Sequence, residues 1–152
     1  MTDRVRLAGA NDAAAIGRLL YDFNREYEEP TPEPSWLAER VRGLMAGDTA
    51  VLLAGDGPDG LALLRFRPSL WTDGLECYLA ELYVVPARRG RGLGRELMNA
   101  VIDYARERGA SYMDLNTAES DVAARSLYES LGFSRTEGRP DGPVNYYYER
   151  EL

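Results

Sequence analysis

The 152-residue sequence contains no histidine and only one cysteine, Cys77. Without histidine, Ser-His-Asp and Cys-His catalysis are excluded, and zinc loses one of its commonest ligands. We therefore expect no bound metal, and acid–base chemistry must rest on Glu, Asp or Tyr, or on water. A single cysteine cannot form an internal disulfide, which fits a reducing compartment.

The sequence also lacks a surplus of basic residues, and its formal net charge is −7. A general nucleic-acid binder needs many cationic side chains to neutralise phosphates, so none is expected here. No apolar run approaches the roughly 20 residues that cross a bilayer. The segment Met1–Arg4 lacks the basic and apolar regions of a signal peptide, so we expect a cytoplasmic protein without membrane contact.

Hydrophobic periodicity predicts one α/β domain over residues 1–152, with a central mixed sheet of about seven strands flanked by about four helices. Helical spacing predicts helices over residues 12–27, 35–46, 93–108 and 121–131. Short apolar or alternating runs predict strands near residues 4–7, 50–54, 61–67, 76–85, 112–116, 133–136 and 144–149. No internal repeat or change in composition indicates a second domain.

Three glycines and four arginines lie in the stretch Pro86-Ala87-Arg88-Arg89-Gly90-Arg91-Gly92-Leu93-Gly94-Arg95, between a predicted strand and a predicted helix. Glycine lets the backbone approach an anion closely, and the first N–H groups of a helix point at it. The arginines add positive charge, so the stretch predicts a pyrophosphate site; an exposed basic turn is the alternative. A P-loop and a Rossmann site are excluded, because Gly-Lys-Ser/Thr and Gly-x-Gly-x-x-Gly are both absent.

Two strings resemble motifs of the GNAT superfamily of acyl-CoA-dependent N-acyltransferases. Leu82-Tyr83-Val84-Val85-Pro86 with Arg89-Gly90-Arg91-Gly92-Leu93-Gly94 resembles motif A, and Leu127-Tyr128-Glu129-Ser130-Leu131-Gly132-Phe133 resembles motif B. The resemblance implies an N-acetyltransferase with acetyl-CoA as donor. It assigns the cofactor contacts to Tyr83, Val84, Val85, Arg89, Gly90, Arg91, Gly92, Leu93, Gly94 and Arg95.

One position departs from the family pattern. Asp121 stands where many members carry Asn, and an acid there would lie close to an anionic cofactor. Asn116, at the end of the preceding predicted strand, is therefore the candidate to make that polar contact instead.

The resemblance also implies catalytic roles. It places the hydroxyl of Tyr128 near the coenzyme A sulfur, where a phenol can protonate the departing thiolate. Glu81 alternates onto the same strand face as Tyr83 and is the candidate general base, directly or through water. A core role for Tyr128 and an outward-facing surface role for Glu81 are the structural alternatives. A backbone N–H of the strand ending at Val85 is the expected oxyanion donor.

The acceptor is expected to be the primary amine of a small cationic molecule, attacked directly in a ternary complex. Aromatic and acidic residues suit such an amine, and the candidates are Tyr27, Glu28, Trp71 and Tyr146. Acetylation of a protein or peptide, or a non-catalytic acyl-CoA-binding regulatory module, are the alternatives. Because Tyr146-Tyr147-Tyr148 is aromatic and dimers are common in the family, we also expect a homodimer, with Tyr147 turned inward by strand alternation.

Overall fold

The computed structural model describes residues 4–152. Met1, Thr2 and Asp3, the first residues of the segment compared above with signal peptides, lie outside the described residues. The chain divides into two compact units, one that ends at Asp114 and one from Leu115 to Leu152.

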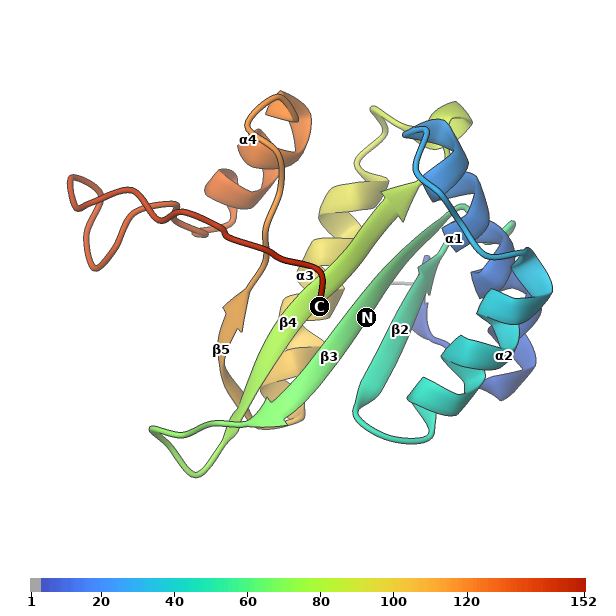
Figure 1. Ribbon diagram of the computed structural model, residues 1–152, viewed down its shortest axis with the longest axis horizontal. Coiled ribbons are helices and arrows are strands. Elements are labelled where there is room, and N and C mark those ends of the chain that lie inside the picture. The colour runs from blue at the N-terminus through green and yellow to red at the C-terminus, as the bar shows by residue number, and fades with distance from the viewer. Residues whose placement is uncertain (1–3) are drawn as a thin grey trace. The chain divides into compact units, whose positions relative to one another are not determined.

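The first unit is built on a mixed five-stranded sheet (Figure 1). Its strands, in spatial as well as chain order, are β1 (Val5–Leu7), β2 (Thr49–Ala54), β3 (Gly60–Pro68), β4 (Leu75–Val84) and β5 (Ala110–Asp114). The first four strands pair with their neighbours in antiparallel fashion, whereas β5 is parallel to β4. The parallel step is possible because helix α3 (Leu93–Glu107) lies between β4 and β5 in the chain.

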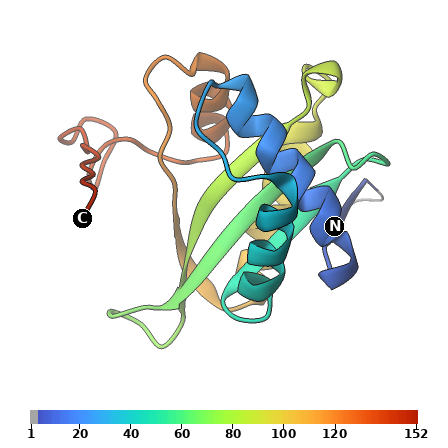
Figure 2. The same cartoon turned by 45° about the vertical axis from the view of Figure 1, so that its right-hand side comes forward.

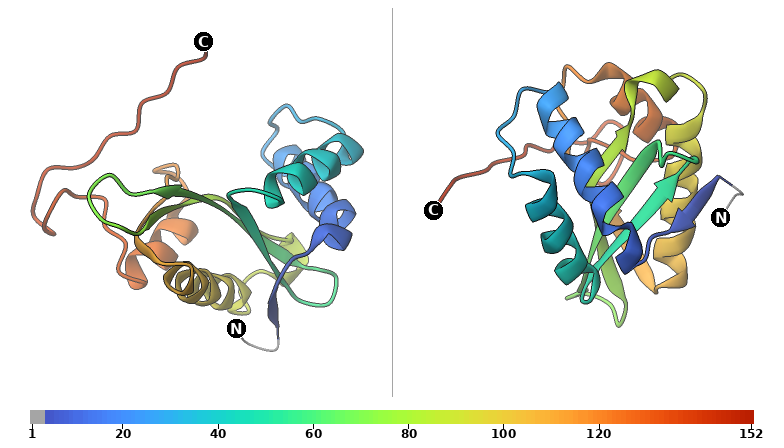
Figure 3. Two further views of the ribbon diagram at one scale, coloured as in Figure 1. Left: turned by 90° about the horizontal axis from the view of Figure 1, so that it is seen from below. Right: turned by 90° about the vertical axis from the view of Figure 1, so that its right-hand side faces the viewer.

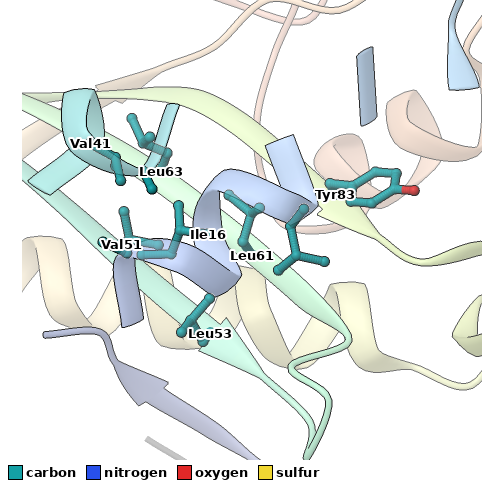
Figure 4. Packing of buried hydrophobic residues seen from close by; sticks show 10 residues of the cluster. Ile16, Val41, Val51, Leu53, Leu61, Leu63 and Tyr83 are labelled. Atoms are coloured by element: carbon teal, nitrogen blue, oxygen red, sulfur yellow. The ribbon is translucent and has the colours of Figure 1, made fainter. Parts of the chain in front are cut away.

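Helices α1 (Ala13–Glu26) and α2 (Pro34–Met45) lie side by side on one face of this sheet (Figure 2). Ile16 of α1 and Val41 of α2 are buried against inward-facing side chains of β2 and β3 (Figure 4). These strand residues are Val51, Leu53, Leu61 and Leu63. Helix α3 covers the opposite face (Figure 3). Its residues Leu97, Met98 and Val101 are fully buried. Both faces of β2 are therefore buried, which explains why its sequence is apolar throughout.

The second unit contains helix α4 (Val122–Ser130). With α1, α2 and α3 it gives four α-helices in the described part of the chain, as predicted. Two short 3-10 turns, Ala10–Asp12 and Pro86–Arg88, precede α1 and α3.

The prediction of about seven strands is wrong, because the sheet has five. The strands expected near residues 133–136 and 144–149 are reduced to one isolated antiparallel bridge between Thr136 and Val144. The intervening residues contain Pro140 and Pro143, which cannot donate to a strand ladder, and a two-stranded pair alone is marginally stable. The expected inward turn of Tyr147 is also wrong, since Tyr146, Tyr147 and Tyr148 are all exposed.

Candidate active site

Strand β4 has one edge that is only partly paired. β3 runs along its whole length, but its parallel pairing with β5 joins only Leu75–Tyr78 to Ala110–Asp114. From Leu79 to Val84 the second edge has no strand partner among the residues that the structure describes. The backbone groups of this stretch that face away from β3 are therefore available to a ligand that lies along the strand, apart from the Val84 carbonyl, which accepts from Arg89.

The pairing with β3 decides which backbone groups face this open edge. The N–H of Val85 donates to the carbonyl of Asp59 at 2.8 Å, so Val85 is directed toward the β3 side. Because direction alternates along an antiparallel strand, Tyr83 is also directed toward β3, whereas Leu82 and Val84 face outward. Of the three residues expected to contact the cofactor by their backbone, Val84 has its N–H on the open edge. Leu82, which was not among the three, also has its N–H on the open edge.

A β-bulge lies at the start of the open stretch. Leu63 of β3 is opposite Glu81 and Leu64 is opposite Leu79, which leaves Ala80 as one extra residue in β4. A bulge bends the strand and redirects neighbouring side chains. Glu81 and Tyr83 lie opposite Leu63 and Leu61, on the α1 and α2 face, as alternation predicted. Glu81 is half-buried, and this burial raises the pKa of its carboxyl group above the usual range.

The glycine loop, residues 86–92, connects the open edge of β4 to α3. Gly90 and Gly92 adopt φ values of 77° and 80°, a left-handed conformation that disfavours any side chain. Gly92 is the N-cap of α3, so the first-turn N–H groups of Leu93, Gly94 and Arg95 lie directly after it. Such N–H groups lack helical partners and attract an anion. A Cβ at Gly90 or Gly92 would meet no atom within 4 Å, so backbone conformation rather than lack of space requires glycine.

The arginines of this stretch are not equivalent. Arg91 and Arg95 are exposed and form no ion pair with any residue from 4 to 152, so they can supply positive charge to a phosphate. Arg88 lies 3.8 Å from a carboxylate oxygen of Asp59. Arg89 is held by its neighbours much more closely.

Arg89 joins β4 to the end of α1. Its Nη1 and Nη2 donate to the two carboxylate oxygens of Glu26, both at 2.8 Å, and its Nε donates to the carbonyl of Val84 at 2.9 Å. The hydroxyl of Tyr83 donates to the same Glu26 carboxylate at 3.1 Å. These bonds lower the pKa of Glu26, while burial and the Glu26 carboxylate raise the pKa of Tyr83 to about 12. Figure 4 shows Tyr83 at one end of the apolar cluster with its hydroxyl directed away from it.

Glu26 was missed by sequence analysis, although one signal was present. It is the last residue of α1, where the negative end of the helix dipole disfavours an acid. An acid at that position therefore suggests a cationic partner. A hollow of about 560 Å³ opens beside it, and its lining residues are Tyr21, Asp22, Arg25, Glu26, Tyr83, Val85 and Pro86.

The predicted acceptor residues of the first unit lie at opposite ends of β4. Tyr27 and Glu28 directly follow α1 beside Tyr83, near the end of β4, and the Phe23 ring packs on both tyrosines. Trp71 lies in the loop before β4 and is 84% exposed. The ten residues of β4 separate the two positions by about 30 Å. The structure therefore does not bring Trp71 together with Tyr27 and Glu28.

The second unit carries Tyr128, Asn116 and Tyr146. Tyr128 lies in α4, is 8% exposed, and packs edge-on against Phe133 with ring centroids 6.0 Å apart. Burial, with a smaller contribution from Asp121, raises the pKa of Tyr128 to about 12. Asn116 and Tyr146 are exposed. Asp121 is the N-cap of α4 and accepts the N–H of Ala124 at 3.2 Å, which gives this departure from the family pattern a structural role.

No cluster of three or more potential metal ligands occurs between residues 4 and 152. Nor does that part of the chain contain a helix long and apolar enough to cross a membrane.

Comparison with known proteins identifies the family. The model of the acetyltransferase (GNAT) family matches residues 15–133. The thialysine N-epsilon-acetyltransferase of Mus musculus is 32% identical over 97% of this chain and 93% of that protein. The mycothiol acetyltransferase of Gordonia bronchialis is 34% identical over 92% of this chain, which spans only 48% of that protein.

A solved structure agrees closely. The crystal structure of a protein from Arthrobacter sp. FB24, named as an acetyltransferase, is 45% identical, with a TM-score of 0.89 over 99% of this chain and 97% of that one. The matched residues include the glycine loop, the open edge of β4 and the motif around Tyr128. The chain therefore belongs to the GNAT acetyltransferase family and is an acetyl-CoA-dependent N-acetyltransferase.

Proposed function

We propose that this enzyme transfers the acetyl group of acetyl-CoA to the primary amine of a small cationic molecule, by direct attack in a ternary complex. The open edge of β4 is the observation that supports acetyl-CoA as the donor, because this edge begins beside Glu81 and ends at the glycine loop, so a cofactor lying along it would reach both. The pantetheine arm is extended and has amide groups that can pair with such an edge. The pyrophosphate then lies at the N-terminus of α3, between Arg91 and Arg95.

The acetyl group accordingly lies near the bulge, where the reaction needs a base and an oxyanion donor. Glu81 takes a proton from the incoming ammonium group, directly or through water, and its raised pKa makes it a better base than an exposed glutamate. The neutral amine nitrogen then bonds to the thioester carbonyl carbon. The outward N–H of Leu82 or Val84 donates to the oxygen as it becomes negative.

Collapse of this intermediate breaks the carbon–sulfur bond and leaves the acetyl group on nitrogen. The nitrogen loses its second proton to solvent to give the neutral amide, and Glu81 releases to solvent the proton that it took. The departing thiolate takes a proton from Tyr128, which then regains one from solvent. The Tyr128 hydroxyl, with a pKa of about 12, is protonated at neutral pH, as a general acid must be, although burial makes it a weaker acid than an exposed phenol.

Direct attack is favoured over an acetyl-cysteine intermediate by the state of Cys77. This cysteine is fully buried on β4, and burial raises the pKa of its thiol to about 11. At neutral pH it is a thiol without access to substrate, whereas a nucleophilic cysteine requires an accessible thiolate.

For the acceptor, the thialysine acetyltransferase of mouse supports an amine carried by a small molecule. Tyr27 and Glu28 remain the proposed acceptor contacts of the first unit, and Tyr146 that of the second. Trp71 is not retained with them, because β4 separates it from Tyr27. A protein or peptide acceptor is the second candidate, and the acceptor assay decides between them.

The test is an amine panel incubated with acetyl-CoA, with coenzyme A release and the mass of each acceptor as readouts. We expect one acetyl group on small di- or polyamines and amino-acid amines, and no modification of peptides. Because all 18 cationic side chains of the enzyme are arginine, self-acetylation of lysine cannot confuse the mass readout. Turnover with peptides alone would overturn the proposed acceptor class. An acetyl group transiently bound to Cys77 would overturn direct attack.

A further inference from the structure

Arg89 occupies the motif position at which a phosphate contact was expected, yet its guanidinium already has protein partners. An arginine side chain has five N–H donors. Three of them bind protein acceptors, two on Glu26 and one on the Val84 carbonyl. The planar fork matches the Glu26 carboxylate with two parallel bonds, the geometry that makes such pairs specific. The guanidinium also lies 5.6 Å from the Tyr83 ring centroid.

This arrangement links three segments that the proposed reaction needs. Arg89 belongs to the glycine loop, Val84 to the open edge of β4, and Glu26 to the end of α1. Tyr83 adds a fourth contact, because its hydroxyl binds Glu26 and its ring stacks on Phe23 of α1 with centroids 4.8 Å apart. Tyr27 and Glu28, the proposed acceptor contacts, follow Glu26 directly in the chain.

We propose that Arg89 and Glu26 form a brace that positions the glycine loop for coenzyme A, and that Arg89 does not itself bind the pyrophosphate. The inference rests on the proposed function, because the brace matters only if the loop holds the cofactor. Phosphate charge is then met by the helix N-terminus, Arg91 and Arg95. Arg89 and Glu26 are positioning residues, and neither touches the reacting atoms.

The charges of Glu26 and Arg89 support the proposal that Arg89 does not bind the pyrophosphate. The carboxylate of Glu26 already neutralises Arg89, and the paired carboxylate has a lowered pKa, so it stays ionised at working pH. A neutralised pair attracts a pyrophosphate much less than an unpaired cation does. A pyrophosphate bound to the two remaining N–H donors of Arg89 would have to share this cation with Glu26.

The experiment is a double-mutant cycle on acetyl-CoA binding, with Glu26→Gln, Arg89→Gln and the double variant. Each single substitution breaks the same pair, so each is expected to raise the Kd for acetyl-CoA about fivefold, and the double variant no more than either one. At saturating acetyl-CoA, the change in kcat should be smaller than the change in Kd, because neither residue touches the reacting atoms. Arg91→Gln should weaken binding independently of the cycle.

The matched control lies at the other end of the same helix. Arg6 binds Asp12, the N-cap of α1, through two bonds of 2.9 and 2.8 Å, so it is a similar arginine–carboxylate pair outside the loop. Asp12→Asn should lower the thermal unfolding temperature about as much as Glu26→Gln does, without changing the Kd for acetyl-CoA. Tyr83→Phe removes the hydroxyl bond to Glu26 and preserves the packed ring, so it tests the brace without a risk to the core.

Two results would overturn the inference while leaving the proposed function intact. A large loss of binding in Arg89→Gln, together with unchanged or tighter binding in Glu26→Gln, would show that Arg89 contacts the pyrophosphate itself. Wild-type affinity in both variants would show that the brace does not position the loop. Wild-type protein that failed to bind acetyl-CoA would instead overturn the proposed function and this inference with it.

Discussion

At the residue scale, Tyr128 carries the hydroxyl that is proposed to protonate the departing thiolate, and this hydroxyl is protonated at physiological pH. We expect Tyr128→Phe to lower kcat by about a hundredfold, because a positioned general acid contributes at least that much. The Kd for acetyl-CoA should change little, since only one hydroxyl is removed. Rapid-quench kinetics and equilibrium binding separate the two effects. Unchanged turnover would assign Tyr128 to packing against Phe133 alone.

The environment of Glu81 predicts how the activity depends on pH. Burial raises its pKa above the ordinary value of 4.5, so the carboxyl group becomes a base only above that raised pKa. Activity should therefore rise with pH through an acidic limb that lies above 4.5, and Glu81→Gln should lose both this limb and most of the rate. A pH profile of kcat/KM in the variant that kept the limb would contradict the assignment.

The raised pKa of Glu81 also predicts how the stability of the protein depends on pH. A carboxyl group with a raised folded-state pKa contributes stability below its unfolded pKa, and this contribution is lost as pH rises through the folded value. At neutral pH the burial of the Glu81 carboxyl group is thus a cost to folding. Glu81→Gln should therefore unfold at a higher temperature than the wild type at pH 7, with the difference vanishing below pH 4.5. Thermal unfolding across that range measures it.

At the element scale, the start of α3 depends on the backbone of Gly92. Its φ of 80° is strained for any other residue, so Gly92→Ala should cost about 1–2 kcal/mol of stability and weaken acetyl-CoA binding. The control is Gly43→Ala inside α2, where a Cβ meets nothing within 4 Å. That change should be neutral or stabilising by up to about 1 kcal/mol. If both substitutions changed stability equally, the left-handed backbone of Gly92 would not be the reason that glycine is required there.

Most helices and strands could be predicted from the sequence, but features that depend on pairing between distant segments could not. Helical periodicity and the glycine stops placed all four helices and the five strands of the sheet to within about two residues. The C-terminal strands were wrong because strand formation depends on a neighbouring strand, which local alternation does not report. The bulge at Ala80 and the Arg89–Glu26 pair were missed for a related reason. Both arise from pairing between distant segments, and no spacing along the chain encodes them.

At the scale of the whole molecule, the exposed tyrosines of the C-terminal segment bear on assembly. Tyr146, Tyr147 and Tyr148 expose 78, 64 and 85% of their surface, and aromatic residues are enriched at interfaces. We expect a homodimer in solution, and we expect Ser substitutions at all three positions to weaken it. Sedimentation velocity of the two proteins over a concentration series measures the change. A wild-type monomer at every concentration would refute the expected dimer.

The burial of Cys77 has a practical consequence for the assay of coenzyme A release. The folded chain presents no reactive sulfhydryl, because its one cysteine is enclosed in the sheet. A chromogenic disulfide reagent added during turnover therefore reports liberated coenzyme A without background from the enzyme. Once the protein is denatured, the same reagent should titrate one equivalent per chain, so a single reagent measures both product formed and enzyme lost.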